Sequence, residues 1–154
     1  MNSSRIVLVL LLLAGCGTPP PAASVPVAAT PLAGKVAGAS WTARGATASA
    51  HRAFSDDGGE KWVDISSSTL SCSGFPEAQV IGTIPWNTPA YDLSFSHNLT
   101  IVVHETDGGI MNYVAINGRV ELYDVTDAGA RLRVRAIANA DNSVEGEIGL
   151  TVCD

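Results

Sequence analysis

From residue 35 onward, apolar side chains alternate with polar ones, and Gly, Asn and Asp interrupt the pattern at short intervals. An alternation with a period of two places one set of side chains on each face of a β-strand. No stretch keeps a 3.6-residue apolar period over three turns, as an amphipathic helix would. The sequence therefore predicts an all-β fold. The alternation is clearest where Arg131, Arg133 and Arg135 are interleaved with Leu132, Val134 and Ala136.

Short β-branched runs between turn residues define the expected strands. The Ala-rich residues 42–50 could also be read as helix, but Thr47, Ser49 and Gly45 favour an extended segment. We expect a single antiparallel β-sandwich or open barrel of about eight or nine strands, with a meander-like C-terminal half. The expected strands are residues 35–38, 41–54, 61–68, 79–84, 99–105, 110–116, 119–125, 130–138 and 143–153.

Turn residues in the C-terminal half predict how its strands pair. Asn117-Gly118 is the dipeptide that a two-residue type I′ hairpin requires, since both positions need a positive φ. Further turns are expected at residues 127–129 and 139–141. An odd-length loop keeps apolar side chains opposite apolar ones. The second of these loops would place Arg135 opposite Glu145 and Arg133 opposite Glu147, and the first would place Glu121 beside Arg135 and Tyr123 beside Arg133.

The arginine row on residues 131–135 has two interpretations. Glutamates on both neighbouring strands favour a solvated outer face with matched charges, in which each exposed pair contributes under about 1 kcal/mol. The alternative is a binding site for an anionic ligand.

The first residues of the chain read as an export signal. Arg5 precedes an unbroken run of nine apolar residues, 6–14, which as a helix would cover about half of a membrane's hydrocarbon core. That is the pattern of a secretory signal over residues 1–15 rather than of a membrane span.

The end of this run, Leu13-Ala14-Gly15-Cys16, resembles the lipobox of bacterial lipoproteins. The resemblance implies that the Cys16 thiol carries a diacylglyceryl group, that the chain is cut before Cys16, and that lipid on Cys16 anchors the protein to a membrane. By analogy with this family, Gly17 rather than Asp after the cysteine favours an outer membrane. The resemblance does not say which face of that membrane the protein occupies. An ordinary signal followed by a chance cysteine is the alternative. The whole pattern resembles the small β-sandwich lipoproteins that many bacteria export.

Residues 17–33 contain five of the eight prolines and no charged residue. Proline fixes φ and removes an amide donor, so this composition favours an extended spacer. We expect residues 16–33 to be a lipid-anchored, disordered tether of at most about 40 to 50 Å, followed by a β-sandwich-like domain at 34–154. A Pro-rich ligand for a partner is the alternative, which the absence of basic residues disfavours.

With Cys16 lipidated, Cys72 and Cys153 are the remaining thiols. In an oxidising compartment they are expected to form one disulfide that closes a loop of about 80 residues, worth on the order of 4 kcal/mol. A redox-active pair would normally be close in sequence, and this one is not. A metal site of two cysteines plus histidines is the disfavoured alternative.

The residues that could carry chemistry form no recognised motif. The net charge of −6 disfavours nucleic-acid binding. His51, His97 and His104 have no metal-ligand spacing, and no serine lies in a GxSxG or SxxK context. Residues 56–60 concentrate three carboxylates in a turn, the one place where Ca²⁺ could bind. We expect no catalytic residue, metal or cofactor.

Trp86 and Tyr91 lie in a segment stiffened by two prolines. Such a loop could stack on sugar rings or anchor a protein, or Trp86 could fold back over an open sheet end. The expected function is therefore a membrane-anchored, non-enzymatic protein- or glycan-binding module of the cell envelope. A small envelope hydrolase or hydrolase inhibitor is the second reading, and a purely structural envelope protein is the third.

Overall fold

The computed structural model describes residues 25–50, 59–73 and 77–153, which form eleven β-strands and no helix. The all-β prediction is confirmed. No helix in this part of the chain is long and apolar enough to span a membrane. The strands are β1 (Ala33–Val36), β2 (Ala39–Thr42), β3 (Gly45–Ser49), β4 (Glu60–Ser66), β5 (Val80–Pro85), β6 (Ala90–Asp92), β7 (Leu99–His104), β8 (Ile110–Ala115), β9 (Asn117–Tyr123), β10 (Gly129–Asn139) and β11 (Asn142–Cys153).

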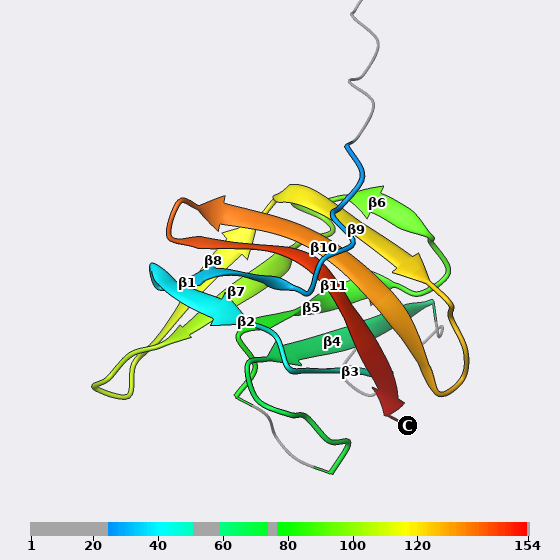
Figure 1. Ribbon diagram of the computed structural model, residues 1–154, viewed down its shortest axis with the longest axis horizontal. Helices are drawn as coiled ribbons and strands as arrows, with labels where there is room; N and C mark the ends of the chain where they lie inside the picture. The colour runs from blue at the N-terminus through cyan, green and yellow to red at the C-terminus, as the bar shows by residue number, and fades with distance from the viewer. Residues whose placement is uncertain (1–24, 51–58, 74–76, 154) are drawn as a thin grey trace, which may run out of the picture.

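Nine strands form one curled sheet, in the order β6-β9-β10-β11-β3-β4-β5-β7-β8, which makes a half-barrel (Figure 1). The β1–β2 hairpin adds to the free side of β11 near its beginning. Strand pairing in the described residues is antiparallel except between β11 and β3, where Thr151 lies beside Thr47 in a parallel register. The open-barrel form of the prediction thus holds, with one parallel pair that makes the sheet mixed.

The division of the chain into strands differs from the expected one in two places, the segment from residue 41 and the strand β6. The segment predicted as one strand from residue 41 divides into β2 and β3, because the amides of Ala43 and Arg44 donate to different partners. Ala43 N–H bonds the carbonyl of Leu32, whereas Arg44 N–H bonds that of Ser66. The chain therefore leaves β1 and joins β4 at this point; residues 51–54 lie outside the described part. The short strand β6, which was not predicted, pairs with β9.

The β10–β11 register is the predicted one: Arg135 lies opposite Glu145 and Arg133 opposite Glu147. The predicted β9–β10 register is wrong by two residues, because Arg133 faces Glu121 and Arg135 faces Arg119. The loop is centred one residue earlier than expected, and Thr126 N–H and Oγ1 both bond the carbonyl of Gly129. Its odd length is kept, so the apolar and charged faces stay where the sequence placed them.

The predicted Asn117-Gly118 hairpin is wrong. Both residues begin β9, and β8 pairs with β7 rather than with β9. Gly118 has a φ of 135°, and a Cβ there would lie 1.8 Å from the carbonyl oxygen of Arg135. The glycine is needed because β10 passes close to the backbone, and not because the chain turns there.

The core lies inside the curl and is mainly aliphatic. Because side chains alternate along each strand, the residues between the core residues point outward. The outer faces of β9–β11 and of β4, β5 and β7 are consequently two of the surfaces that the fold presents. The fully buried residues include Val63 and Ile65 of β4, Val80 and Ile84 of β5, Leu99 and Ile101 of β7, and Leu132 and Val134 of β10.

Candidate functional site

The structure describes two of the three cysteines, Cys72 and Cys153. Cys16 lies outside the described residues, so its lipidation stays a prediction. Cys72, in the connection between β4 and β5, is bonded to Cys153 at the end of β11. The disulfide joins the last strand to the middle of the chain, as expected from the sequence.

Trp86 and Tyr91 are half-buried and pack against the core. Lys61 Nζ lies 5.3 Å from the centre of the Trp86 ring, and the Tyr91 ring lies 5.7 Å from that of His97. The Tyr91 hydroxyl is buried, and burial together with the nearby Glu60 carboxylate raises the pKa of Tyr91. This arrangement matches the alternative in which the loop folds back over the sheet.

His97 and His104, the histidine candidates within the described part of the chain, do not form a site together. His97 lies in the loop before β7 and His104 at the end of β7, and both are exposed. His51, Asp56 and Asp57 lie outside the described residues, and the calcium hypothesis, which depends on the two aspartates, stays a prediction. In the described ranges no three His, Cys, Asp or Glu side chains are close enough to hold a metal ion.

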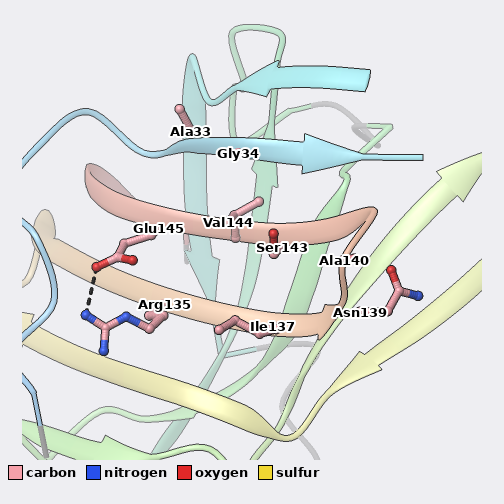
Figure 2. Close-up of a pocket in the computed structure, with 9 residues that line it drawn as sticks. All are labelled: Ala33, Gly34, Arg135, Ile137, Asn139, Ala140, Ser143, Val144 and Glu145. Atoms are coloured by element: carbon pink, nitrogen blue, oxygen red, sulfur yellow. Dashed lines mark hydrogen bonds and ion pairs between the residues drawn. The ribbon is translucent and has the colours of Figure 1, made fainter. Parts of the chain in front are cut away.

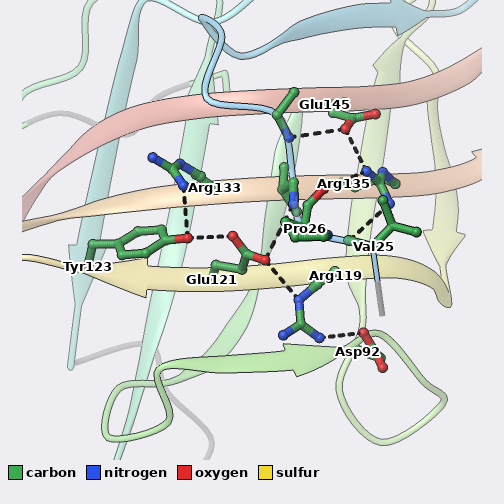
Figure 3. A network of polar contacts seen from close by, with 11 residues as sticks. Val25, Pro26, Asp92, Arg119, Glu121, Tyr123, Arg133, Arg135 and Glu145 are labelled. Atoms are coloured by element: carbon green, nitrogen blue, oxygen red, sulfur yellow. Dashed lines mark hydrogen bonds and ion pairs between the residues drawn. The ribbon is translucent and has the colours of Figure 1, made fainter. Parts of the chain in front are cut away.

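The outer face of β9, β10 and β11 carries a network of ion pairs (Figure 3). Each arginine on these strands has a carboxylate partner. The charges are therefore matched, as the sequence indicated, and no arginine is left over to hold an anion. The bonds of this network join Arg119 Nη1 to Asp92 at 2.8 Å, Arg119 Nε to Glu121 at 2.9 Å, the Tyr123 hydroxyl to Glu121 at 2.5 Å, Arg133 to the Tyr123 hydroxyl at 3.0 Å, Arg133 and Arg131 to Glu147, and Arg135 to Glu145 at 2.8 Å.

Residues 25–32, which we call the clasp, cross this network in an extended conformation (Figures 1 and 3). The clasp amides of Val27 and Ala28 donate to Glu121 and Glu145 over 3.4 and 3.3 Å. Arg135 Nη2 donates to the carbonyl of Pro26 at 3.1 Å and its Nη1 to that of Val25 at 3.4 Å. One arginine and two glutamates thus hold the backbone of the clasp across three strands.

The clasp then runs beside β11. The carbonyl of Thr30 accepts the amide of Glu147 at 2.6 Å, and the amide of Leu32 donates to the carbonyl of Glu147 at 3.0 Å. Val27 is 4% exposed and Leu32 only 1%. Residues 25–33 therefore belong to the folded domain, which corrects the expectation that the disordered tether extends to residue 33.

The carboxylates that hold the clasp are stabilised in their charged form. Hydrogen bonds from Arg135 and from the Ala28 amide lower the pKa of Glu145, against an opposing effect of burial. Burial raises the pKa of Glu121, but hydrogen bonds from Tyr123, Arg119 and Val27 outweigh it, so the net pKa is lowered. The clasp amides therefore bond ionised acceptors at neutral pH, which makes these bonds stronger than neutral ones.

A pocket of about 290 Å³ continues from the clasp along β10 and β11 (Figure 2). The Arg135–Glu145 pair stands at one end of the pocket, and Asn139 and Ala140 at the other. Because its arginine is already paired, the pocket offers no unmatched charge to a ligand.

A second hollow, of about 270 Å³, lies on the outer face of β4, β5 and β7 and differs in chemistry. None of the described residues lining it is charged. Thr83 Oγ1 is buried there and has no hydrogen-bond partner in the described part of the chain. The lining residues are Trp62, Gly82, Thr83, Ser96, Asn98 and Thr100.

Sequence reasoning missed both the clasp and this second hollow. A signal for the clasp was available, since Val27 and Leu32 are large apolar residues in a segment otherwise typical of a spacer. Nothing local marks Trp62 as part of a site, because the hollow depends on how β4, β5 and β7 lie together. Comparisons with protein-family models, with curated proteins and with solved structures found no match, so the function is argued from the residues alone.

Proposed function

We propose that this chain is an exported, lipid-anchored protein of the bacterial cell envelope, and that its β-domain is a non-enzymatic module that binds a partner. The anchor rests on the signal-like residues 1–15 and on the lipobox ending at Cys16. Binding rests on a single structural observation, the hollow on the outer face of β4, β5 and β7, whose described lining residues carry no charge.

The position of the clasp supports different roles for the two outer faces. It brings the N-terminal part of the chain to β9–β11, where ion pairs are matched internally and fix backbone rather than a ligand. The hollow lies on strands that face β9–β11 across the core, so it opens away from the clasp. A domain anchored through the clasp would leave the hollow accessible to a partner.

The anchor is tested by metabolic labelling of a bacterial host with an alkyne fatty acid. The full chain is expected to be labelled and to fractionate with membranes, and Cys16→Ser is expected to lose the label. A chain carrying Cys72→Ser and Cys153→Ser is the matched control, which removes the other two thiols and should keep the label. Labelling that persists in Cys16→Ser would show that the anchor is assigned wrongly.

A further inference from the structure

We propose that β8 is an interaction surface at which two copies of this chain pair edge to edge, an inference that goes beyond partner binding at the hollow and does not depend on it. β8 ends the sheet, and among the described residues it pairs only with β7. Its six residues include no charged residue and no proline, and its pairing with β7 keeps one register throughout. Charges, prolines and bulges are what keep the edge strands of natural proteins from pairing. β8 is therefore an unprotected edge.

The opposite edge of the sheet is protected. β6 has only three residues and ends at Asp92, whose carboxylate binds Arg119 at 2.8 Å. A short strand and a charged side chain both limit pairing with another chain. Figure 1 shows the turn of the β7–β8 hairpin projecting beyond the neighbouring strands, so a second strand can reach β8.

The backbone of β8 has free hydrogen-bonding groups at this edge. At the turn of the β7–β8 hairpin, the amide of Glu105 donates to the carbonyl of Gly109. Hydrogen-bonded pairs alternate along an antiparallel ladder, so every second residue counted from Gly109 bonds β7. The N–H and C=O groups of Ile110, Asn112 and Val114 therefore point to the other side, where no described residue bonds them.

Large apolar side chains surround these free backbone groups. Ile110 is 60% exposed, Val114 50% and Met111 45%. Side chains alternate along a strand, so Ile110 and Val114 share the outer face with Asn112, whereas Met111 shares the inner face with the half-buried Tyr113. A strand added at this edge would cover apolar surface on both faces and supply the missing backbone bonds.

The side chains of β8 identify a second copy as the added strand. An antiparallel register centred on Asn112 pairs the free groups of all three residues in both copies. It places Ile110 opposite Val114 of the second copy, Met111 opposite its Tyr113, and the two Asn112 amides opposite each other, where they can form hydrogen bonds. No charged side chains meet, so identical strands do not repel. A register shifted by two residues would leave backbone groups unpaired and place Ile110 opposite Asn112. Such self-complementarity is what a two-fold symmetric interface requires.

Cysteine cross-linking of the full chain in intact cells of a bacterial host tests this register. Asn112→Cys is expected to give a disulfide-linked dimer on oxidation with copper phenanthroline, since the two Cα atoms would lie about 5.5 Å apart. Ile110→Cys and Val114→Cys should each stay monomeric, because each would lie about 14 Å from its own copy, and should form the dimer when expressed together. Val125→Cys is the matched control, because Val125 is 45% exposed but lies between β9 and β10.

A charge at the edge should separate the two copies. Val114→Lys, added to the Asn112→Cys chain, is expected to lower the yield of cross-linked dimer about tenfold, since two lysines would enter the pair without a counter-charge. Val125→Lys in the same chain should leave the yield unchanged. Slow hydrogen exchange of the buried core amides shows that each variant is folded.

Four results would overturn the pairing: no dimer from Asn112→Cys, as much dimer from Val125→Cys, a yield that Val114→Lys does not change, or dimers from Ile110→Cys alone. A cross-linked product with a mass other than that of the dimer would show a different protein at this edge and would also contradict self-association. Loss of the anchor or of binding at the hollow would contradict the proposed function and leave the pairing of β8 standing.

Discussion

Thr83 is a polar side chain whose hydroxyl the described fold leaves without a hydrogen bond. It is on the outer face of β5, opposite Trp62, and its hydroxyl oxygen is buried without a partner among the described residues. An unsatisfied buried polar group costs about 1 to 3 kcal/mol. A sequence that specified only the fold would gain stability from valine at this position.

The expected consequence is that Thr83→Val raises the free energy of unfolding by about 1 kcal/mol. The measurement is urea denaturation, comparing midpoint and slope with those of the parent chain. Thr42→Val makes the same chemical change at an exposed strand position and should alter stability by no more than about 0.5 kcal/mol. A loss of stability in Thr83→Val would mean that its hydroxyl has a structural partner.

At the scale of elements, the clasp depends on one glycine in β11. Gly146 has a φ of 138°, and a Cβ there would lie 2.6 Å from the carbonyl oxygen of Thr30 and 2.7 Å from the Leu32 Cα. All of these atoms belong to the backbone, so they cannot move aside as a flexible side chain could. Gly146 is therefore what allows the clasp to lie against β11.

Gly146→Ala is expected to destabilise the domain by about 2 to 3 kcal/mol, because both the backbone conformation and the close approach are lost. Hydrogen exchange should show faster exchange of the Val27 and Ala28 amides. Gly149→Ala is the matched control on the same strand, since a Cβ there meets nothing within 4 Å. Equal stability of the two variants would rule out the close approach as the function of Gly146.

The elements also show what the sequence could and could not predict. Alternation is a local signal, and it located most of the strands and the arginine and glutamate faces of β10 and β11. The centre of the β9–β10 loop and the use of Asn117-Gly118 depend on which strand lies alongside, which no local pattern records. The clasp is the extreme case, because Val27 bonds a carboxylate 94 residues further along the chain.

At the scale of the whole molecule, the clasp and the disulfide fix the two ends of the described domain. Cys153 is tied to Cys72 across a separation of 81 residues, and the clasp is tied to β9, β10 and β11. If Cys16 carries lipid, the chain free to separate the bilayer from the domain runs only to Val25 and not to residue 33. Nine residues reach about 30 Å when extended, whereas seventeen reach about 50 Å.

The clasp thus predicts a short distance between the domain and the membrane. Neutron reflectometry of the lipidated chain on a supported bilayer should give a gap of no more than about 30 Å between headgroups and protein. Gly146→Ala, which removes the clasp from β11, should allow a wider gap, up to about 50 Å, whereas Gly149→Ala should match the parent chain. A parent gap beyond about 30 Å would mean that the clasp is open when the protein is anchored, because the covalent chain from Cys16 to Val25 cannot span more.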